Sequence, residues 1–266
     1  MFAGATADRE DADYVVVGAP LDVSTSFQPG TRFGPDRVRQ FARTFEDYDH
    51  RTDQSFSALG VHDQGDVHAW DDTEEYLDYL RGTLTDVLWD DAVPLLVGGE
   101  HTVSVAGVRA VEPDVFVALD AHLDLRESYD GNPLSHSTVT RHALDIADEA
   151  YVVGARSGSD AEWARAREAD VTVVEPSEAE SWSPSLSGNV YLSVDVDAAD
   201  PAFAPGTGTP EPGGLSSRTM RRLVRELAPA ASAFDVVEVN DRDDGQAAVL
   251  GAKLLRDFVY AHADSG

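Results

Sequence analysis

Short apolar runs alternate with amphipathic stretches along this 266-residue chain, and the alternation limits the folds that it can adopt. Most apolar runs are rich in β-branched residues and apolar at both odd and even positions, which is typical of strands covered on both faces. These predicted strands are 14–18, 93–97, 115–119, 151–154, 171–174, 190–194 and 234–239. The predicted helices between them are 35–45, 73–88, 103–111, 138–147, 161–169, 216–227 and 245–261. The pattern predicts a single α/β domain over residues 1–266, a three-layer α-β-α arrangement around a largely parallel sheet.

Polar clusters follow three of the predicted strands. In chain order they are Gly98-Gly99-Glu100-His101, Asp120-Ala121-His122-Leu123-Asp124 and Asp195-Val196-Asp197. Because ligands bind beyond the carboxyl ends of the strands in parallel α/β sheets, we expect the clusters to form one site. Their imidazoles and aspartates suit two divalent cations held close together, and such a pair turns water into a nucleophile at neutral pH.

The spacing within the clusters adds a geometric prediction. Asp120, His122 and Asp124 are two residues apart, so they share one face if the strand geometry continues through them. An acidic residue on a buried strand is costly unless it is paired or metal-bound. The alternative is that the strands simply end and the aspartates lie in solvated loops. We interpret Glu100 as a supporting or structural residue rather than a ligand, and Asp200, before a proline, as a turn residue.

The charge balance excludes several kinds of partner. The chain has 49 acidic and 20 basic residues, a formal net charge of −29, and Lys253 is its single lysine. No basic stripe can meet phosphates, so we expect no binding to nucleic acid and none to an anionic membrane. The acids are spread along the chain, as in cytoplasmic proteins of salt-in halophiles, where salt screens the self-repulsion.

Other features of the composition restrict the chemistry and the location. The chain has no cysteine, so a metal site must use oxygen and nitrogen ligands, and disulfides are excluded. It has no apolar run of about 20 residues, so we expect no transmembrane helix. Residues 1–13 are polar and acidic, unlike a signal peptide. We therefore expect a cytoplasmic protein.

The three clusters resemble the signature motifs of a known family. Gly-Gly-Glu-His at 98–101, Asp-Ala-His-Leu-Asp at 120–124 and Ser-Val-Asp-Val-Asp-Ala-Ala-Asp-Pro at 193–201 are similar to motifs of the ureohydrolases, the arginases, agmatinases and relatives. Residues 18–22 and 28–35 resemble the N-terminal family pattern, and residues 235–240 resemble the C-terminal one. The match covers about 13–240, and the chain most resembles an agmatinase from a halophilic archaeon. The resemblance implies the arginase/deacetylase-like fold and a homo-oligomer, either a trimer or a hexamer.

The resemblance also implies a binuclear manganese site with two Mn²⁺ per subunit. The first ion would be held by His101, Asp120, Asp124 and Asp195, and the second by Asp120, His122, Asp195 and Asp197. A hydroxide bridging the two ions would attack the guanidinium carbon. Asp124 would then pass a proton to the leaving nitrogen.

Two more residues match catalytic positions of the family. His136 matches a proton-shuttling histidine, although Ser137 stands where agmatinases commonly have glycine. The alternative is a surface histidine at a helix start. Glu238 matches the acid that orients the guanidinium group, to which a carboxylate can offer two hydrogen-bond acceptors. The alternative for Glu238 is an internal ion pair with an arginine.

The substrate is the least constrained prediction. The loop 125–133 lacks the arginase pattern, and Arg126 stands where arginases have asparagine. The short chain and the segments 135–141 and 154–158 look more like agmatinase, which hydrolyses agmatine to putrescine and urea. Arg126 either meets a carboxylate of an acidic substrate or forms a surface salt bridge. The alternatives are aminopropyl-agmatine, guanidinobutyrate, arginine, formimidoyl-glutamate, or a non-catalytic metal-binding relative.

Overall fold

A single parallel sheet organises the computed structural model, which describes residues 1–240 and 242–265. Its strands are β1 (Tyr14–Ala19), β4 (Val61–Asp66), β5 (Val93–Gly98), β6 (Val115–Leu119), β7 (Glu149–Val153), β8 (Val171–Val174), β9 (Val190–Asp195) and β10 (Ala231–Val237). They lie in the order β4-β1-β5-β10-β9-β6-β7-β8, and every neighbouring pair is parallel. A small separate hairpin joins β2 (Tyr48–Asp49) to β3 (Gln54–Ser55).

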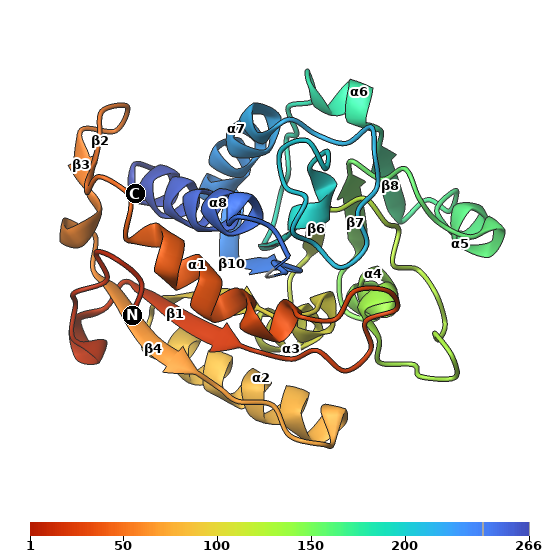
Figure 1. The fold of residues 1–266 in the computed structure, drawn as a ribbon, viewed down its shortest axis with the longest axis horizontal. Coiled ribbons are helices and arrows are strands. Elements are labelled where there is room, and N and C mark those ends of the chain that lie inside the picture. The colour runs from red at the N-terminus through yellow and green to blue at the C-terminus, as the bar shows by residue number, and fades with distance from the viewer. Residues whose placement is uncertain (241, 266) are drawn as a thin grey trace.

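Helices cover both faces of the sheet (Figure 1). They are α1 (Gly34–Ala42), α2 (Thr73–Trp89), α3 (Ser104–Val111), α4 (Val139–Ala143), α5 (Asp160–Arg165), α6 (Pro176–Ala179), α7 (Ser217–Leu227) and α8 (Gln246–Ala263). On β5, Leu95 and Val97 join the core formed with α1, α7 and α8, whereas Leu96 joins the core formed with α2, α3 and α4. None of the helices in the described part of the chain is long and apolar enough to cross a membrane.

The predicted three-layer α/β fold is confirmed, and the differences are local. Each predicted strand and helix is present, although β10 ends two residues earlier than predicted. Three helices also end early: α1 at Ala42 rather than 45, α4 at Ala143 rather than 147, and α5 at Arg165 rather than 169. The sequence analysis missed β4, the β2–β3 hairpin and the single turn of α6. These missed elements are short or polar, so they carry no run of apolar residues to reveal them.

The polar sequence of the edge strand β4 explains why it was not predicted. Its sequence, Val-His-Asp-Gln-Gly-Asp, is mostly polar, and two of its side chains, Asp63 and Asp66, form ion pairs with Arg39 instead of packing against apolar residues. Asp63 accepts hydrogen bonds from Arg39 of α1, with Nε and Nη2 each 2.9 Å from a carboxylate oxygen. Both side chains are buried, so this bidentate pair joins α1 to the edge of the sheet.

Candidate metal centre

The polar clusters meet at the carboxyl ends of four adjacent strands, β5, β10, β9 and β6. His101 begins the 3₁₀ turn η4 (His101–Val103) after β5, Asp120 follows β6, and Asp195 is the last residue of β9. Glu238 follows β10, so the fourth strand also contributes an acidic residue. The fold therefore brings the clusters together at the carboxyl ends of the strands, as expected from the sequence.

The turn after β5 brings His101 against the neighbouring strand through a close backbone contact. Gly99 N–H donates to Ala19 O at 2.7 Å, and a Cβ on Gly99 would lie 1.9 Å from Leu21 O. Only glycine fits so close an approach of two backbones. The contact fixes the start of η4 and, with it, the backbone of His101.

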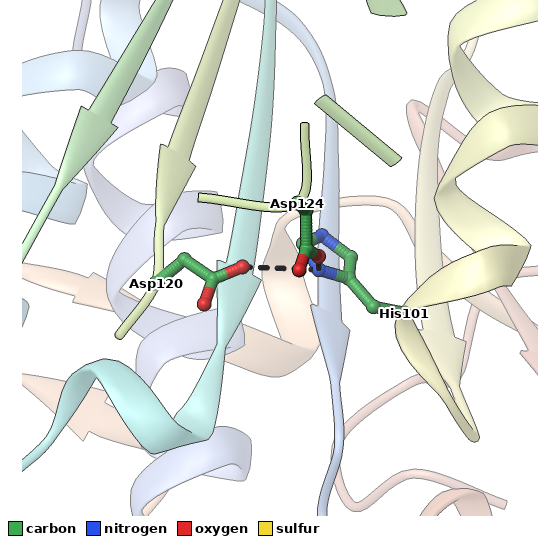
Figure 2. Close-up of side chains that lie close together, drawn as sticks. All are labelled: His101, Asp120 and Asp124. Atoms are coloured by element: carbon green, nitrogen blue, oxygen red, sulfur yellow. Dashed lines mark hydrogen bonds and ion pairs between the residues drawn. The ribbon is translucent and has the colours of Figure 1, made fainter. Parts of the chain in front are cut away.

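His101 faces two aspartates of the second cluster (Figure 2). Its Nδ1 lies 2.9 Å from Asp124 Oδ2 and 3.1 Å from Asp120 Oδ2. Asp195 Oδ2 is slightly farther, at 3.8 Å. All four side chains are buried, so these nitrogen and oxygen atoms converge in a region that solvent hardly reaches.

A second group of ligand atoms lies beside the first. His122 Nδ1 is 3.0 Å from Asp197 Oδ2 and 3.6 Å from Asp120 Oδ1. In each group, His101–Asp120–Asp124 and Asp120–His122–Asp197, the candidate ligand atoms lie within 4.8 Å of one another. Asp120 belongs to both groups, and a carboxylate with one oxygen toward each group can bridge two ions.

Hydrogen bonds orient these carboxylates. Asp120 Oδ1 accepts from His122 N–H at 2.7 Å, Asp195 Oδ1 from Asp197 N–H at 2.8 Å, and Asp197 Oδ1 from Ala121 N–H at 3.0 Å. The buried Oδ2 of Asp120 accepts no hydrogen bond from the described residues, although His101 is near. An unpartnered buried carboxylate oxygen is costly, so the arrangement fits a cation at this point.

The condition under which Asp120, His122 and Asp124 would share a strand face is not met. The strand β6 ends at Leu119, and Asp124 has a left-handed backbone with φ of 51°. Hydrogen bonds from backbone N–H groups to aspartate side chains close tight turns here, and such turns compete with continued strand geometry. The side chains still converge, but through turns rather than through alternation along a strand.

The electrostatics of the centre favour a cation. Burial, and then the negative charge of Asp120, raises the pKa of Asp124 to about 7. Burial also raises the pKa of Asp195 well above its usual value, and the charges of Asp197 and Asp120 add to this. For His122, burial lowers the pKa, but Asp197 and Asp120 outweigh it and raise the pKa to about 12. The two imidazoles cannot neutralise the negative charge of the four neighbouring aspartates. The residues present therefore fit divalent metal ions.

A buried hydrogen-bonded chain supports His101 from behind. His101 Nε2 lies 3.0 Å from Ser193 Oγ, and Ser193 donates to Asp235 Oδ1 at 2.6 Å. Tyr191 donates to the other oxygen of Asp235 at 2.8 Å. Partners of this kind fix the orientation of a ligating imidazole. The sequence analysis did not assign these residues to the site, although Ser193 and Asp235 lie in the quoted motifs.

Glu238 lies next to His101 with an unusual backbone. Its φ is 63°, and its Oε1 accepts the His101 N–H at 2.9 Å. Burial raises the pKa of Glu238 well above its usual value; the His101 hydrogen bond opposes this, while the charges of Glu100 and Asp197 add to it. No arginine forms an ion pair with Glu238 among the described residues, so the alternative of an internal arginine partner finds no support there.

A cavity of about 320 Å³ opens beside the centre. Its walls include His122, Asp124 and His136, together with Arg126 and Glu162. His136 begins the 3₁₀ turn η5 (His136–Thr138) and is half-buried, so it is not the freely exposed histidine of the alternative interpretation. Burial lowers the pKa of His136, against the opposing charge of Glu100.

Arg126 forms a salt bridge, the second of the two roles considered for it. Its Nε lies 3.3 Å from Glu162 Oε2, and its guanidinium carbon is 5.7 Å from the centre of the Tyr129 ring. Glu162 is buried and also accepts from Ser159 N–H at 2.8 Å. Glu162 and Tyr129 were not identified from the sequence, because no spacing signals that these loops meet.

Arg156 fastens the loop that carries Asp197. Its guanidinium donates to the carbonyl oxygens of Gly154, Asp197 and Glu211 at 2.7–2.9 Å, and to two further carbonyls at 3.2–3.3 Å. Asp200 in the same loop is a turn residue, as predicted. Its side chain accepts from Ala202 N–H at 2.9 Å and from Gly213 N–H at 2.7 Å.

The fold and the site together define a class, the ureohydrolases, in which a parallel α/β sheet carries a histidine–aspartate centre at its carboxyl edge. The chain belongs to the arginase family, whose model matches residues 12–260. This confirms the family resemblance read from the motifs. The family generally depends on a binuclear metal centre, and the two ligand groups around Asp120 are in keeping with that dependence.

Individual relatives narrow the class further. The chain is 35% identical to an agmatinase from Pyrococcus horikoshii, covering 94% of this chain and 92% of the relative. It is 34% identical to an N(1)-aminopropylagmatine ureohydrolase from Thermococcus kodakarensis, over 97% and 94% of the two chains. Its fold is similar to that of the agmatine ureohydrolase of Thermoplasma volcanium, with a TM-score of 0.91, 34% identity and coverage of 99% and 94%. The chain is an agmatinase-like ureohydrolase that acts on guanidino C–N bonds.

Proposed function

We propose that the protein hydrolyses agmatine to putrescine and urea. The observation that carries the proposal is the pair of ligand groups that share Asp120 and border a cavity lined by His136 and Asp124. A centre of this composition suits attack by water on a planar, cationic carbon, and the guanidinium of agmatine is such a group. The identity to curated agmatinases over nearly the whole chain supports the same substrate class.

The proposal includes two Mn²⁺ ions per subunit. Their ligands would be His101, Asp120, Asp124 and Asp195 for one ion, and Asp120, His122, Asp195 and Asp197 for the other. When bound, the ions lower the pKa of water and orient it for attack. Nitrogen and oxygen donors without sulfur suit manganese among the divalent metals.

The side chains around the centre then have distinct tasks. Glu238, with one oxygen already held by His101 N–H, offers its other oxygen to the guanidinium N–H groups. A Cβ on Gly208 would lie 3.0 Å from Glu238 Oε2, so the glycine keeps space beside that oxygen. Asp124 passes a proton to the leaving nitrogen, and His136 exchanges protons between the cavity and solvent.

The charges of the protein favour agmatine over substrates with an acidic distal end. Arg126 pairs with Glu162, so its charge is already balanced and does not specifically select a carboxylate tail. The net charge of −29 attracts a dication, although high salt screens this attraction. Aminopropyl-agmatine is the second candidate, because a relative of similar identity is an N(1)-aminopropylagmatine ureohydrolase. Guanidinobutyrate, arginine, formimidoyl-glutamate and a non-catalytic role are the outcomes to exclude.

The direct test is urea release in molar KCl with added Mn²⁺. Agmatine, aminopropyl-agmatine, arginine and guanidinobutyrate are compared at equal concentration, and formimidoyl-glutamate is followed by formamide release. Asp120→Ala removes the residue common to both ligand groups and should abolish turnover. Asp145→Ala is the matched control, since that aspartate is exposed and outside the centre.

Each result of this assay decides one part of the proposal. Agmatine as the best substrate by kcat/KM supports it in full. Urea chiefly from another guanidino compound keeps the reaction and corrects the substrate. No product from any compound, with the fold intact and two ions bound, would refute the catalytic function and favour a binding role.

The proposal also covers the cellular location, the salt environment and the subunit number of the protein. We infer a cytoplasmic enzyme of a salt-in halophile from the acidic composition, and a trimer or hexamer from the family resemblance. Light scattering in molar KCl measures the subunit number directly. Circular dichroism during dialysis toward dilute buffer tests whether the fold requires high salt. Full secondary structure without salt would contradict a halophilic origin.

A further inference from the structure

Glu100 lies in a signature motif, yet it is not a member of either ligand group. It is fully buried, with an exposed fraction of 0%. Its Oε2 accepts from Val23 N–H and Ser24 N–H, both at 2.7 Å. Its Oε1 accepts from the hydroxyls of Ser24 and Thr102, also at 2.7 Å each. Four donors fill the acceptor sites of one carboxylate, so Glu100 fixes the Ser24 backbone and hydroxyl together.

Ser24 in turn contacts the histidine of the cavity. Its Oγ accepts the His136 backbone N–H at 3.0 Å and lies 3.2 Å from His136 Nδ1. Ser24 and His136 are 112 residues apart in the chain, so the contact ties the loop after β1 to the turn η5. The three residues form a chain from a buried carboxylate, through a hydroxyl, to an imidazole.

The hydrogen bonds of Ser24 favour one of the two ring tautomers of His136. A serine hydroxyl has one hydrogen, and that of Ser24 is used in the short bond to Glu100. Ser24 Oγ can therefore only accept from His136, and its contact with the ring is a hydrogen bond when the proton is on Nδ1. The lone pair is then on Nε2, which lies 3.3 Å from the exposed Ser26 hydroxyl on the cavity wall.

A second hydroxyl near the ring does not replace Ser24. Ser135 Oγ is also 3.2 Å from His136 Nδ1, but it caps the same turn as His136 and accepts from Ser137 N–H. It moves with the histidine, so it cannot fix the ring relative to the metal centre. Ser24 can, because Glu100 directly precedes His101 and holds Ser24 by two hydrogen bonds and the preceding residue, Val23, by a third.

We propose that Ser24, held by Glu100, is a positioning residue that keeps His136 protonated on Nδ1 with the Nε2 lone pair available to the cavity. The proposal rests on the proposed proton-transfer role of His136. In that role, Nε2 takes a proton to give the imidazolium and later releases it to solvent or to the leaving amine, so the proton count is unchanged over a cycle.

Ser24→Ala is the main test, with Thr102→Val as its matched control. Both variants remove a hydroxyl that donates to the same Glu100 oxygen at 2.7 Å, but only Ser24 contacts His136. We expect Ser24→Ala to lower kcat for agmatine about 10- to 100-fold with KM changed less than about twofold, because a misplaced catalytic group costs rate rather than binding. Thr102→Val should stay close to wild-type kcat, and Ser24→Thr, which restores the hydroxyl, should recover most of it.

A second readout does not depend on activity. In protein labelled with ¹⁵N-histidine, the ring nitrogen shifts of His136, identified by their loss in His136→Ala, should report the neutral Nδ1–H form. Ser24→Ala should shift them toward the Nε2–H form, and Thr102→Val should leave them unchanged.

The outcomes separate this inference from the proposed function. Equal kcat losses in Ser24→Ala and Thr102→Val, or unchanged nitrogen shifts in Ser24→Ala, would overturn the positioning role while urea release by the wild type stands. Wild-type kcat in His136→Ala would also overturn it, since the residue being positioned would then do nothing. Absence of any product from the wild type refutes the proposed function, and the nitrogen shifts still decide the role of Ser24 in orienting the ring.

Discussion

Removing divalent ions should destabilise this fold, because the acids of the centre then face one another without a cation. Asp120 has a buried oxygen that accepts no hydrogen bond from the described residues, and the pKa values of Asp124 and Asp195 are raised by burial and by neighbouring carboxylates. Ions that bind only the folded chain relieve this repulsion and shift the unfolding equilibrium toward the native state.

The size of the effect follows from the two ligand groups. One ion at about 100 times its Kd stabilises the folded state by about 2.7 kcal/mol, so two ions give about 5 kcal/mol. For a chain of this length, 1 kcal/mol moves Tm by about 2–4 °C, which predicts a rise of about 10–20 °C on saturation with metal.

The assay is thermal unfolding in molar KCl, with protein stripped by a chelator and then titrated with Mn²⁺. The high salt keeps the net charge of −29 screened, so that non-specific cation effects are small. Asp120→Ala should lose most of the rise because Asp120 belongs to both ligand groups, and Asp145→Ala should keep it. A Tm that is the same with chelator and with Mn²⁺, or that rises equally in Asp120→Ala, would refute the reasoning.

Three further predictions concern the rest of the fold. Arg39→Met leaves the fully buried Asp63 without its cation and should cost about 3–5 kcal/mol in chemical denaturation; a loss below 1 kcal/mol would contradict the assigned burial. Burial raises the pKa of Asp63, but the hydrogen bonds and charge of Arg39 outweigh it and lower the pKa; its stabilisation is therefore present above the unfolded pKa of about 4 and lost as pH falls through the folded value. Asp63→Asn should accordingly flatten the acid limb of the stability profile, and an unchanged limb would count against the pair. Gly99→Ala places a Cβ 1.9 Å from Leu21 O and should lower Tm sharply or prevent folding, whereas normal expression and Tm would show that the loop can move.

The central strands and the ligand clusters were predictable because both leave local signals. Strands such as β5 and β6 are buried on both faces, so each appears in the sequence as an unbroken apolar run. Clusters such as the one beginning at Asp120 follow these runs directly, and parallel strands bring their carboxyl ends to one edge. The family followed from the order of the motifs. The metal-ligand roles in these clusters, and the catalytic roles of Asp124, His136 and Glu238, stay predictions.

The features of the site that the sequence did not predict depend on contacts between segments far apart in the chain. Ser24 and Glu100 are 76 residues apart, and nothing in either segment indicates that a hydroxyl of one meets a carboxylate of the other. The left-handed backbone at Asp124 and Glu238 is equally hidden, because neither residue is glycine. The surrounding fold imposes both conformations, so local sequence propensity does not predict them.

Arg156 has a consequence for how a family of such enzymes can diversify. It holds the segment from Asp197 to Glu211 only through main-chain carbonyl oxygens, which every amino acid possesses. The exposed side chains of that segment can therefore be exchanged without loosening the attachment, provided that the backbone path is kept. Natural variation or directed evolution of this segment can explore new contacts to the substrate while the anchoring arginine holds the backbone of the candidate ligand Asp197 in register. Mutational libraries confined to the exposed and half-buried positions of 201–211, without the buried residues 204 and 206–208, should accordingly retain folded protein far more often than libraries that also vary position 156.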